Sequence, residues 1–152
     1  MTAVDIVVRK ALPKDIDAMC GLLKLLFAIE TDFAYDGGKQ RCGLELMLQQ
    51  ENAGCVLVAE LNQTIIGMCS AQLLVSTAEG GLKAVIEDVV IMESYRGQRI
   101  GRRLLTTMAE WAVSQGAKRL DLLADQRNQA ALSFYRKLGW CQTELVCLQK
   151  KL

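Results

Sequence analysis

The chain has 152 residues, 51% of them hydrophobic and 23% charged, so we expect one globular domain over residues 1–152 with a core of its own. Its 18 basic and 17 acidic residues leave a net charge of +1. The net charge therefore gives no reason to expect binding to nucleic acid or to an acidic membrane. The absence of histidine excludes imidazole-based catalytic triads and zinc sites, and we expect no metal.

The N-terminal part of the chain is predicted to form a strand and two helices. Apolar residues first alternate with polar ones, as in a strand; these residues are Val4, Ile6 and Val8. Pro13 can begin a helix, because apolar residues then recur every three or four positions to about Ala28. The polar residues 30–38 predict a loop, and a short helix is expected over residues 39–50.

The middle of the chain predicts three strands, over residues 55–61, 64–75 and 84–92. Turn signals separate them, so we expect an antiparallel meander with a bulge near Gly67.

Helices and strands alternate in the last third. We expect a helix over residues 100–115, a strand over 119–124, a helix over 128–138 and a strand over 142–149. The order βααβββαβαβ predicts an α/β protein of the α+β type, with one mixed, mostly antiparallel sheet flanked by helices. A parallel pair beside the meander can leave a ligand crevice at the ends of the strands.

The six cysteines include no C-x-x-C pair, and we interpret them as small buried side chains rather than ligands or disulfides. This usage fits a reducing compartment. The N-terminus lacks the apolar core of a signal peptide, and no run reaches the ~20 apolar residues that span a bilayer. We therefore expect a soluble, cytoplasmic protein.

The sequence RGQRIG, residues 96–101, follows an apolar strand and opens an amphipathic helix. A strand, a glycine-bearing loop and a helix aim free backbone N–H groups and the helix dipole at an anion, so we predict a phosphorylated ligand. The alternative is an ordinary turn with exposed arginines. Four arginines cluster at this entrance: Arg96, Arg99, Arg102 and Arg103.

This loop resembles the phosphate loop of the GNAT superfamily, N-acetyltransferases that transfer an acetyl group from acetyl-CoA to an amine. Arg96 and Gly101 match the outer positions of the family pattern Q/R-x-x-G-x-G/A, and Tyr95 and Gly97 fit its Y-R-G opening. Arg99 replaces the central glycine. We expect it to adopt helical dihedrals and to alter the affinity for CoA without abolishing binding.

A second resemblance covers the sequence NQAALSFYRKLGW, residues 128–140, which in the family borders the CoA tail. Asn128 and Tyr135 are spaced to lie on roughly one helix face. In the family role, the phenol of Tyr135 would protonate the departing CoA thiolate. The alternative is a half-buried aromatic side chain with a hydrated hydroxyl group.

The string IEDVVI is similar to the equivalent strand of diamine and hexosamine-phosphate N-acetyltransferases, where the glutamate lies at the acceptor amine. The resemblance implies that Glu87 binds or deprotonates an ammonium group, whose reference pKa is roughly 10.4. Strand alternation would send Glu87 and Asp88 to opposite faces unless a bulge intervenes. The alternative is an ion pair at the strand end.

The resemblance implies acetyl-CoA as the cosubstrate, with its pantetheine arm paired to a strand backbone and its carbonyl polarised by a backbone N–H. The residues expected to bind it are Val89, Val90, Ile91, Arg96, Gly97, Gln98, Arg99, Ile100, Gly101, Arg102, Asn128 and Tyr135.

The family sets its acceptor specificity largely with the first two helices and the loop between them. In this loop, carboxylates flank two aromatic residues, which suits a small cation through ion pairing and cation–π contact; the alternative is an ordinary solvated loop. The expected acceptor-binding residues are Glu30, Asp32, Phe33 and Tyr35, together with Glu87, and Asp36 lies beside them.

We therefore predict direct acetyl transfer to a primary amine of a small molecule within a ternary complex. No cysteine has a neighbouring base that would favour an acyl-enzyme. The alternatives are a peptide or protein amine as acceptor, a non-catalytic CoA-binding module, and an RNA binder built on the arginines; charge and aromatic content count against RNA. The family often forms homodimers, but no residue of this sequence demonstrates one.

Overall fold

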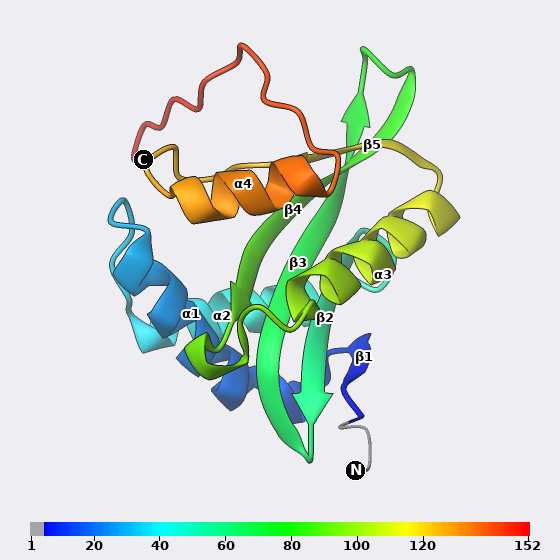
Figure 1. Cartoon of the computed structure of the whole chain (residues 1–152). Coiled ribbons are helices and arrows are strands. Elements are labelled where there is room, and N and C mark those ends of the chain that lie inside the picture. Colours follow the sequence, from blue (N-terminus) through cyan, green and yellow to red (C-terminus); the bar gives the residue numbers. More distant parts are fainter. Residues whose placement is uncertain (1–4) are drawn as a thin grey trace. The chain divides into compact units, whose positions relative to one another are not determined.

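The computed structural model describes residues 5–152, which form two compact units divided between Asp121 and Leu122. Val4 of the predicted first strand lies outside the described residues. The elements are β1 (Val7–Lys10), α1 (Ile16–Ile29), α2 (Gly37–Leu48), β2 (Gly54–Leu61), β3 (Thr64–Ser76), β4 (Gly81–Ile91), α3 (Ile100–Ser114), β5 (Ala117–Leu122) and α4 (Gln129–Lys137), with single 3₁₀ turns at Pro13–Asp15 and Glu93–Tyr95 (Figure 1).

The first unit is built on a five-stranded sheet in the order β1-β2-β3-β4-β5. Strands β1 to β4 pair with their neighbours in antiparallel fashion. Strands β4 and β5 run in the same direction, because residues later in β4 contact residues later in β5. Gly81 faces Lys118, and Lys83 forms an ion pair of 2.9 Å with Asp121. This is the relation of parallel strands, so the predicted mixed, mostly antiparallel sheet is confirmed.

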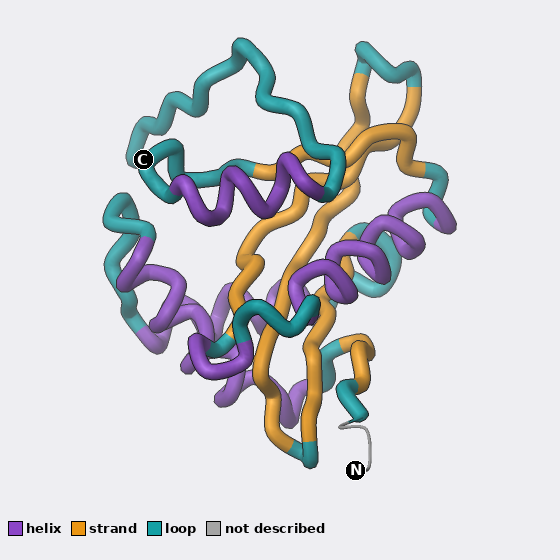
Figure 2. The backbone as a smooth tube through the Cα atoms, viewed as in Figure 1, coloured by secondary structure: helices purple, strands orange, loops and turns teal. Residues whose placement is uncertain are grey.

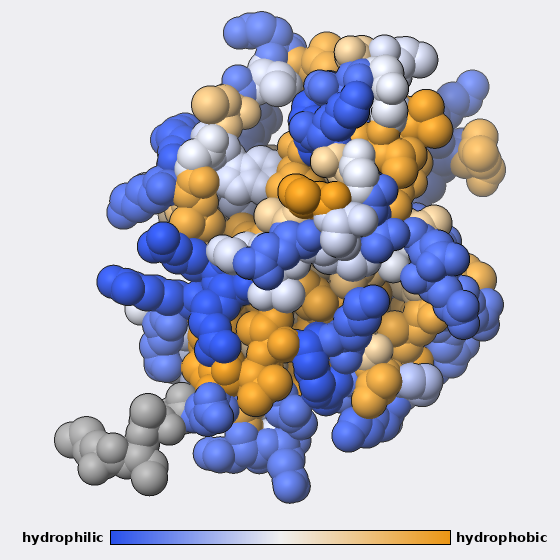
Figure 3. Space-filling view, turned by 90° about the vertical axis from the view of Figure 1, so that its right-hand side faces the viewer, coloured by the Kyte–Doolittle hydropathy of each residue, from blue (hydrophilic) through white to orange (hydrophobic). Residues whose placement is uncertain are grey.

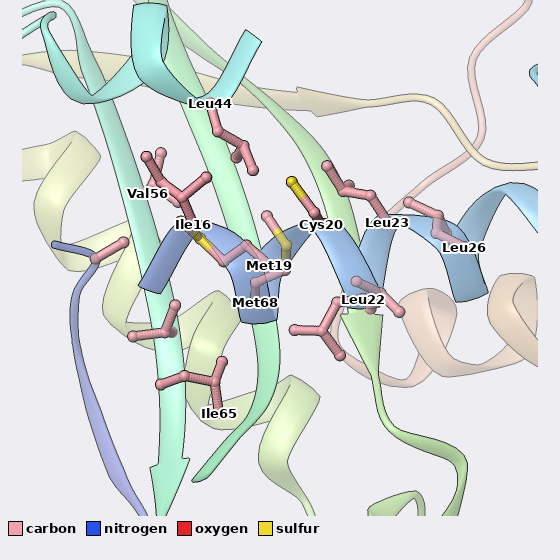
Figure 4. Close-up of a cluster of buried hydrophobic side chains, with 13 residues drawn as sticks. Ile16, Met19, Cys20, Leu22, Leu23, Leu26, Leu44, Val56, Ile65 and Met68 are labelled. Atoms are coloured by element: carbon pink, nitrogen blue, oxygen red, sulfur yellow. The ribbon is translucent and has the colours of Figure 1, made fainter. Parts of the chain in front are cut away.

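One face of the sheet is covered by α1 and α2. Apolar residues of α1 recur every three or four positions, so they form one buried stripe. Val56 of β2 and Met68 of β3 pack against it, and Leu44 of α2 closes the cluster (Figure 4). The stripe consists of Ile16, Met19, Cys20, Leu22, Leu23 and Leu26.

Helix α3 packs on β3 with Ile100, Leu104 and Met108, all of which are buried. A Cβ atom on Gly67 would lie 2.7 Å from Ile91 Cδ1 and 3.4 Å from Leu104 Cδ1, so this glycine permits a close approach. The pairing of β2 with β3 shifts between Ala59 and Glu60, opposite Gly67. The bulge predicted near Gly67 is therefore confirmed.

An ion pair joins β1 to the start of α1. The carboxylate of Asp15 accepts hydrogen bonds from Arg9 Nη1 (2.7 Å), Arg9 Nη2 (3.0 Å) and the Leu12 backbone N–H (2.7 Å). Asp15 is buried, and Glu60 on β2 accepts from Arg9 Nε at 3.1 Å. This network fixes the turn that leads from the sheet edge into α1.

The predicted last strand, residues 142–149, is wrong: the chain after α4 has no regular secondary structure (Figure 2). Leu145, Val146 and Leu148 are 80–89% exposed. Their apolar character favours a strand, but a strand needs a neighbouring strand to pair with, and none pairs with these residues in the part of the chain that is described.

The interpretation of the cysteines is correct for Cys20, Cys55 and Cys69, which are buried, and wrong for the three others. All six are free thiols. The exposed ones are Cys42, Cys141 and Cys147.

Hydrophobic patches on the face seen in Figure 3 are separated by hydrophilic side chains, as is normal for a surface in contact with water. Within residues 5–152, no helix is long and apolar enough to cross a bilayer, and no group of acidic residues and cysteines is placed to hold a metal ion.

Candidate functional site

The second half of β4 has one open edge. Asp121 is next to the last residue of β5 and is level with Lys83, so residues 87–91 continue past the end of β5. The Met92 N–H donates to Ile66 O at 2.8 Å, toward β3. Backbone N–H groups of successive residues in a strand point to opposite edges. The N–H of Ile91 therefore points away from β3, toward the open edge. An extended ligand can pair with the backbone at this edge.

A β-bulge lies where β4 begins this open stretch. Ser70 pairs with Glu87 and Met68 with Val90, so Cys69 alone faces two residues, Asp88 and Val89. Glu87 is exposed and lines a shallow depression with Gln72, Leu74 and Val85. The bulge therefore interrupts the strand alternation that would otherwise send Glu87 and Asp88 to opposite faces of the sheet.

Asp88 is half-buried and has a left-handed backbone conformation, with φ +55°. The Ser70 hydroxyl lies 3.3 Å from its Oδ2 and 3.2 Å from the Glu87 carbonyl oxygen. Burial, reinforced by the charge of Glu87, raises the pKa of Asp88 to about 6, although the Ser70 hydroxyl opposes the shift.

The loop after β4 is tied back to the strand. Arg96 Nε donates to the Ile91 carbonyl oxygen at 3.1 Å, so this predicted cofactor residue also positions the loop. Gly97 has φ +77°, which a side chain would strain. Both residues and Gln98 are exposed. The backbone of this loop is thus open to a ligand.

Arg99, the residue before α3, does not have the expected helical dihedrals: its φ is +65° and its ψ is 16°, in the left-handed region. The glycine of the family pattern adopts this conformation without strain, whereas a Cβ atom makes it unfavourable. The chain changes direction at Arg99 to enter α3, and Arg99 holds the strained left-handed conformation.

The first turn of α3 has the properties of an anion site. The first hydrogen bond of the helix runs from the Arg103 N–H to Arg99 O, so the N–H groups of Ile100, Gly101 and Arg102 precede it. No acidic residue lies in this turn, and Arg102 and Arg103 are exposed. Positive side chains at the positive end of a helix dipole are unfavourable by themselves, and a bound phosphate would relieve this.

We expect Arg99→Gly to be more stable to unfolding than Arg99→Ala by about 1 kcal/mol, because only glycine relieves the left-handed conformation. Both variants remove the same charge, so we expect them to lose the same salt-dependent part of the acetyl-CoA affinity. Urea unfolding and binding titrations at two salt concentrations measure these quantities. Equal stabilities would contradict the role given to the conformation.

The second unit contains Asn128 and Tyr135. Asn128 caps α4, because its side chain accepts a hydrogen bond from the Ala131 N–H at 3.1 Å. Beyond the helix, Gly139 has φ +95°, and the Trp140 N–H donates to Tyr135 O at 3.1 Å. This is a Schellman motif, which accounts for Gly139 and Trp140 in the sequence pattern. The ring of Tyr135 packs against those of Phe134 and Trp140, with centroids 5.2 and 6.1 Å away.

Several side chains of the predicted acceptor loop between α1 and α2 make contacts within the protein. Phe33 packs on Phe27, with 5.7 Å between ring centroids, and Lys24 Nζ lies 5.8 Å from the centroid of the Tyr35 ring. Asp36 caps α2 by accepting from the Gly38 and Lys39 N–H groups. Phe33 and Tyr35 are still 44% and 39% exposed, so they remain accessible. Glu30 is half-buried at the end of α1, and Asp32 is exposed on the turn between the helices.

The structure brings one set of predicted residues together in the first unit: Glu87, the open edge at residues 89–91 and the loop at residues 96–102. Asn128 and Tyr135 belong to the second unit. Sequence reasoning considered Asp88 with Glu87 but assigned the amine-binding role to Glu87, and it missed Ser70. An aspartate inside an apolar strand was the available signal, because Asp is rare in strands and tolerates left-handed backbone.

The profile of the Acetyltransferase (GNAT) family matches residues 23–140, most of the chain. The chain belongs to this family. The match includes β4, the loop before α3 and the whole of α4.

Relatives and solved structures agree with this assignment. The chain is 36% identical over 78 residues to the glucosamine 6-phosphate N-acetyltransferase of Trypanosoma brucei brucei, covering 50% of each. It is 34% identical over 59 residues to the thialysine N-epsilon-acetyltransferase of Mus musculus, covering 39% of this chain and 35% of that protein. The chain spans 22% to 41% of the lengths of the first curated relatives that it matches.

Among solved structures, the aminoglycoside N-acetyltransferase AAC(6')-Iy, determined in complex with CoA, has a TM-score of 0.85 with 17% sequence identity. The match covers 98% of this chain and 96% of that one. At this identity, the likeness confirms the fold.

Proposed function

We propose that this member of the GNAT family transfers the acetyl group of acetyl-CoA to a primary amine of a small molecule. The observation that carries the proposal is the continuous run of β4 and α3, which holds carboxylates at a bulge, an open strand edge and a basic helix N-terminus in that order. The order of these features along the chain is the one expected for sites that bind an amine, a pantetheine arm and a pyrophosphate.

In this proposal, the open edge at residues 89–91 pairs with the pantetheine arm, and a backbone N–H at this edge polarises the acetyl carbonyl. The first turn of α3 and the loop before it bind the pyrophosphate through their N–H groups and through Arg99 and Arg102. Family membership supports acetyl-CoA as the cosubstrate.

The exposed carboxylate of Glu87 binds the acceptor ammonium or receives its proton, and Tyr135 protonates the CoA thiolate. The role of Tyr135 rests on the family pattern around α4. The exposed aromatic residues of the loop between α1 and α2 contribute to recognition of a cationic acceptor.

A small-molecule acceptor is favoured because the matched relatives include enzymes named for thialysine and glucosamine 6-phosphate. The test is release of CoA thiol from acetyl-CoA across polyamines, amino sugars, amino acids and peptides. We expect turnover with a small amine. Turnover with peptides alone would establish the alternative acceptor class, and acetyl-CoA binding without turnover on any amine would establish a CoA-binding module.

A further inference from the structure

One face of the β3–β4 hairpin extends beyond the cover of α1 and α2. Met68 of β3 packs in the core cluster against α1, and Gln72 and Leu74 follow on the same face by strand alternation. The hairpin continues past both helices (Figure 1), and these two side chains are exposed. The uncovered face begins beside Glu87, where the proposed function places the acceptor ammonium, because Glu87 pairs with Ser70.

A shallow depression lies on this uncovered face. It is lined by Gln72, Leu74, Val85 and Glu87, and its volume is about 140 Å³. The strand register explains the grouping, because Gln72 pairs with Val85 and directly opposite residues share a face of the sheet. Pockets for drug-sized ligands usually measure about 300–1,000 Å³. The depression therefore suits a short chain and not a whole sugar phosphate.

The residues that line the depression carry one negative charge and no positive charge. Glu87 is the charged one, and Gln72 offers a neutral amide. Lys83 lies on the same face opposite Leu74, but its ammonium group is 2.9 Å from the carboxylate of Asp121. The lining therefore offers a partner to one ammonium group, and it offers none to a second ammonium group or to a phosphate.

The apolar part of the depression adjoins its charged end. Val85 is two residues from Glu87 along β4, a distance of about 7 Å at about 3.4 Å per residue. Val85 is half-buried and Leu74 is 50% exposed. One exposed leucine is ordinary on a protein surface, but here two apolar side chains share a depression with a carboxylate. A hydrocarbon chain next to an ammonium group would cover them and release their water.

We propose that the acceptor is a monoamine with a short, neutral, apolar chain, whose ammonium group lies at Glu87 and whose chain lies on Val85 and Leu74. This inference rests on the proposed function and names its substrate class. Gln72 is a specificity-determining residue, because its neutral amide stands where a carboxylate would select a diamine.

The first test compares amines that differ only in their chains. From ethylamine to pentylamine, kcat/KM should rise about twofold for each added methylene group, half of the free energy of complete burial, because the depression is open on one side. Cadaverine, the diamine counterpart of pentylamine, should be about tenfold poorer, because its second ammonium group would lose water without gaining a partner. Glucosamine 6-phosphate should be poorer by at least the same factor.

Val85→Thr tests the apolar contact by replacing one methyl group with a hydroxyl group of similar size. We expect kcat/KM for pentylamine to fall about threefold. The value for ethylamine should not change, because this short chain does not extend from Glu87 to Val85. Val75→Thr is the matched control: Val75 is 79% exposed and follows Leu74 on the opposite face of β3, so neither substrate should be affected.

Gln72→Glu tests the role of the neutral amide through a gain of activity. The second carboxylate should raise the ratio of kcat/KM for cadaverine to that for pentylamine about fivefold, and high salt should reduce this gain. Gln63→Glu is the control, because it makes the same charge change on an exposed glutamine at the turn before β3 and should leave the ratio unchanged. A misfolded variant cannot imitate a gain.

Rates that do not rise with chain length would overturn the inference and leave acetyl transfer intact. The same holds for a wild-type preference for cadaverine or glucosamine 6-phosphate, and for a ratio that Gln72→Glu leaves unchanged. Absence of acetyl transfer to every amine tested would instead overturn the proposed function.

Discussion

Replacing Tyr135 by phenylalanine should lower kcat by about 10²-fold and change the affinity for acetyl-CoA by less than about twofold. The phenol would protonate the CoA thiolate only as the C–S bond breaks, so its loss affects the chemical step and not binding. The ring that packs against Phe134 and Trp140 remains in the variant, which should keep α4 and its Schellman motif intact.

Single-turnover kinetics and a separate acetyl-CoA titration measure the two quantities without interference from product release. Phe134→Leu is the matched control, because it removes a ring that packs on Tyr135 but no hydroxyl group. An unchanged kcat in Tyr135→Phe would exclude Tyr135 as the acid. A similar loss in both variants would show that packing, not proton transfer, explains the effect.

Asp15→Ala is expected to destabilise the first unit by about 3 kcal/mol. The substitution removes the carboxylate that pairs with Arg9 through two hydrogen bonds and leaves the Leu12 N–H without its acceptor. Asp15 is only 4% exposed, so water cannot fully replace these contacts. Unfolding of the first unit can be followed by the fluorescence of Trp111 on α3, once Trp140 of the second unit is replaced by phenylalanine.

The control for this variant is Asp17→Ala, which removes an exposed ion pair with Arg41 at the start of the same helix. Exposed pairs contribute about 0–1 kcal/mol, so urea unfolding should show a much smaller loss. Equal losses in the two variants would contradict the importance given to burial.

The contribution of Asp15 should also depend on pH. Arg9 holds the pKa of Asp15 below its ordinary value, so the folded state binds its proton less readily than the unfolded state. The stabilisation is therefore fully present above the unfolded pKa of about 3.9 and is lost as the pH falls through the lower folded pKa. The difference between wild type and Asp15→Ala should be constant from pH 7 to pH 5 and shrink below about pH 4.

Much of the fold follows from local patterns. The three-to-four-residue spacing of apolar residues predicts α1 and α3 to within a few residues, because one buried stripe is all that a helix on a sheet requires. The meander follows from apolar runs separated by turn signals. Residues 142–149 fail because a strand depends on a partner as well as on its own composition.

The site was harder to predict where backbone conformation decides it. The bulge at Asp88 results from the pairing of β3 with β4, and the sequence of β4 alone does not specify that register. Ser70, which lies 18 residues earlier, becomes the partner of Asp88 only through this pairing. The left-handed Arg99 is similar, because the direction of α3 against the sheet imposes it and its own preference does not.

Direct transfer of an acetyl group to an amine within a ternary complex is tested most directly by initial rates measured with acetyl-CoA and the best acceptor both varied. We predict double-reciprocal lines that intersect, with one acetylated amine formed for each CoA thiol released. Parallel lines, or acetyl-CoA consumed without any acetylated amine, would contradict direct transfer to the amine.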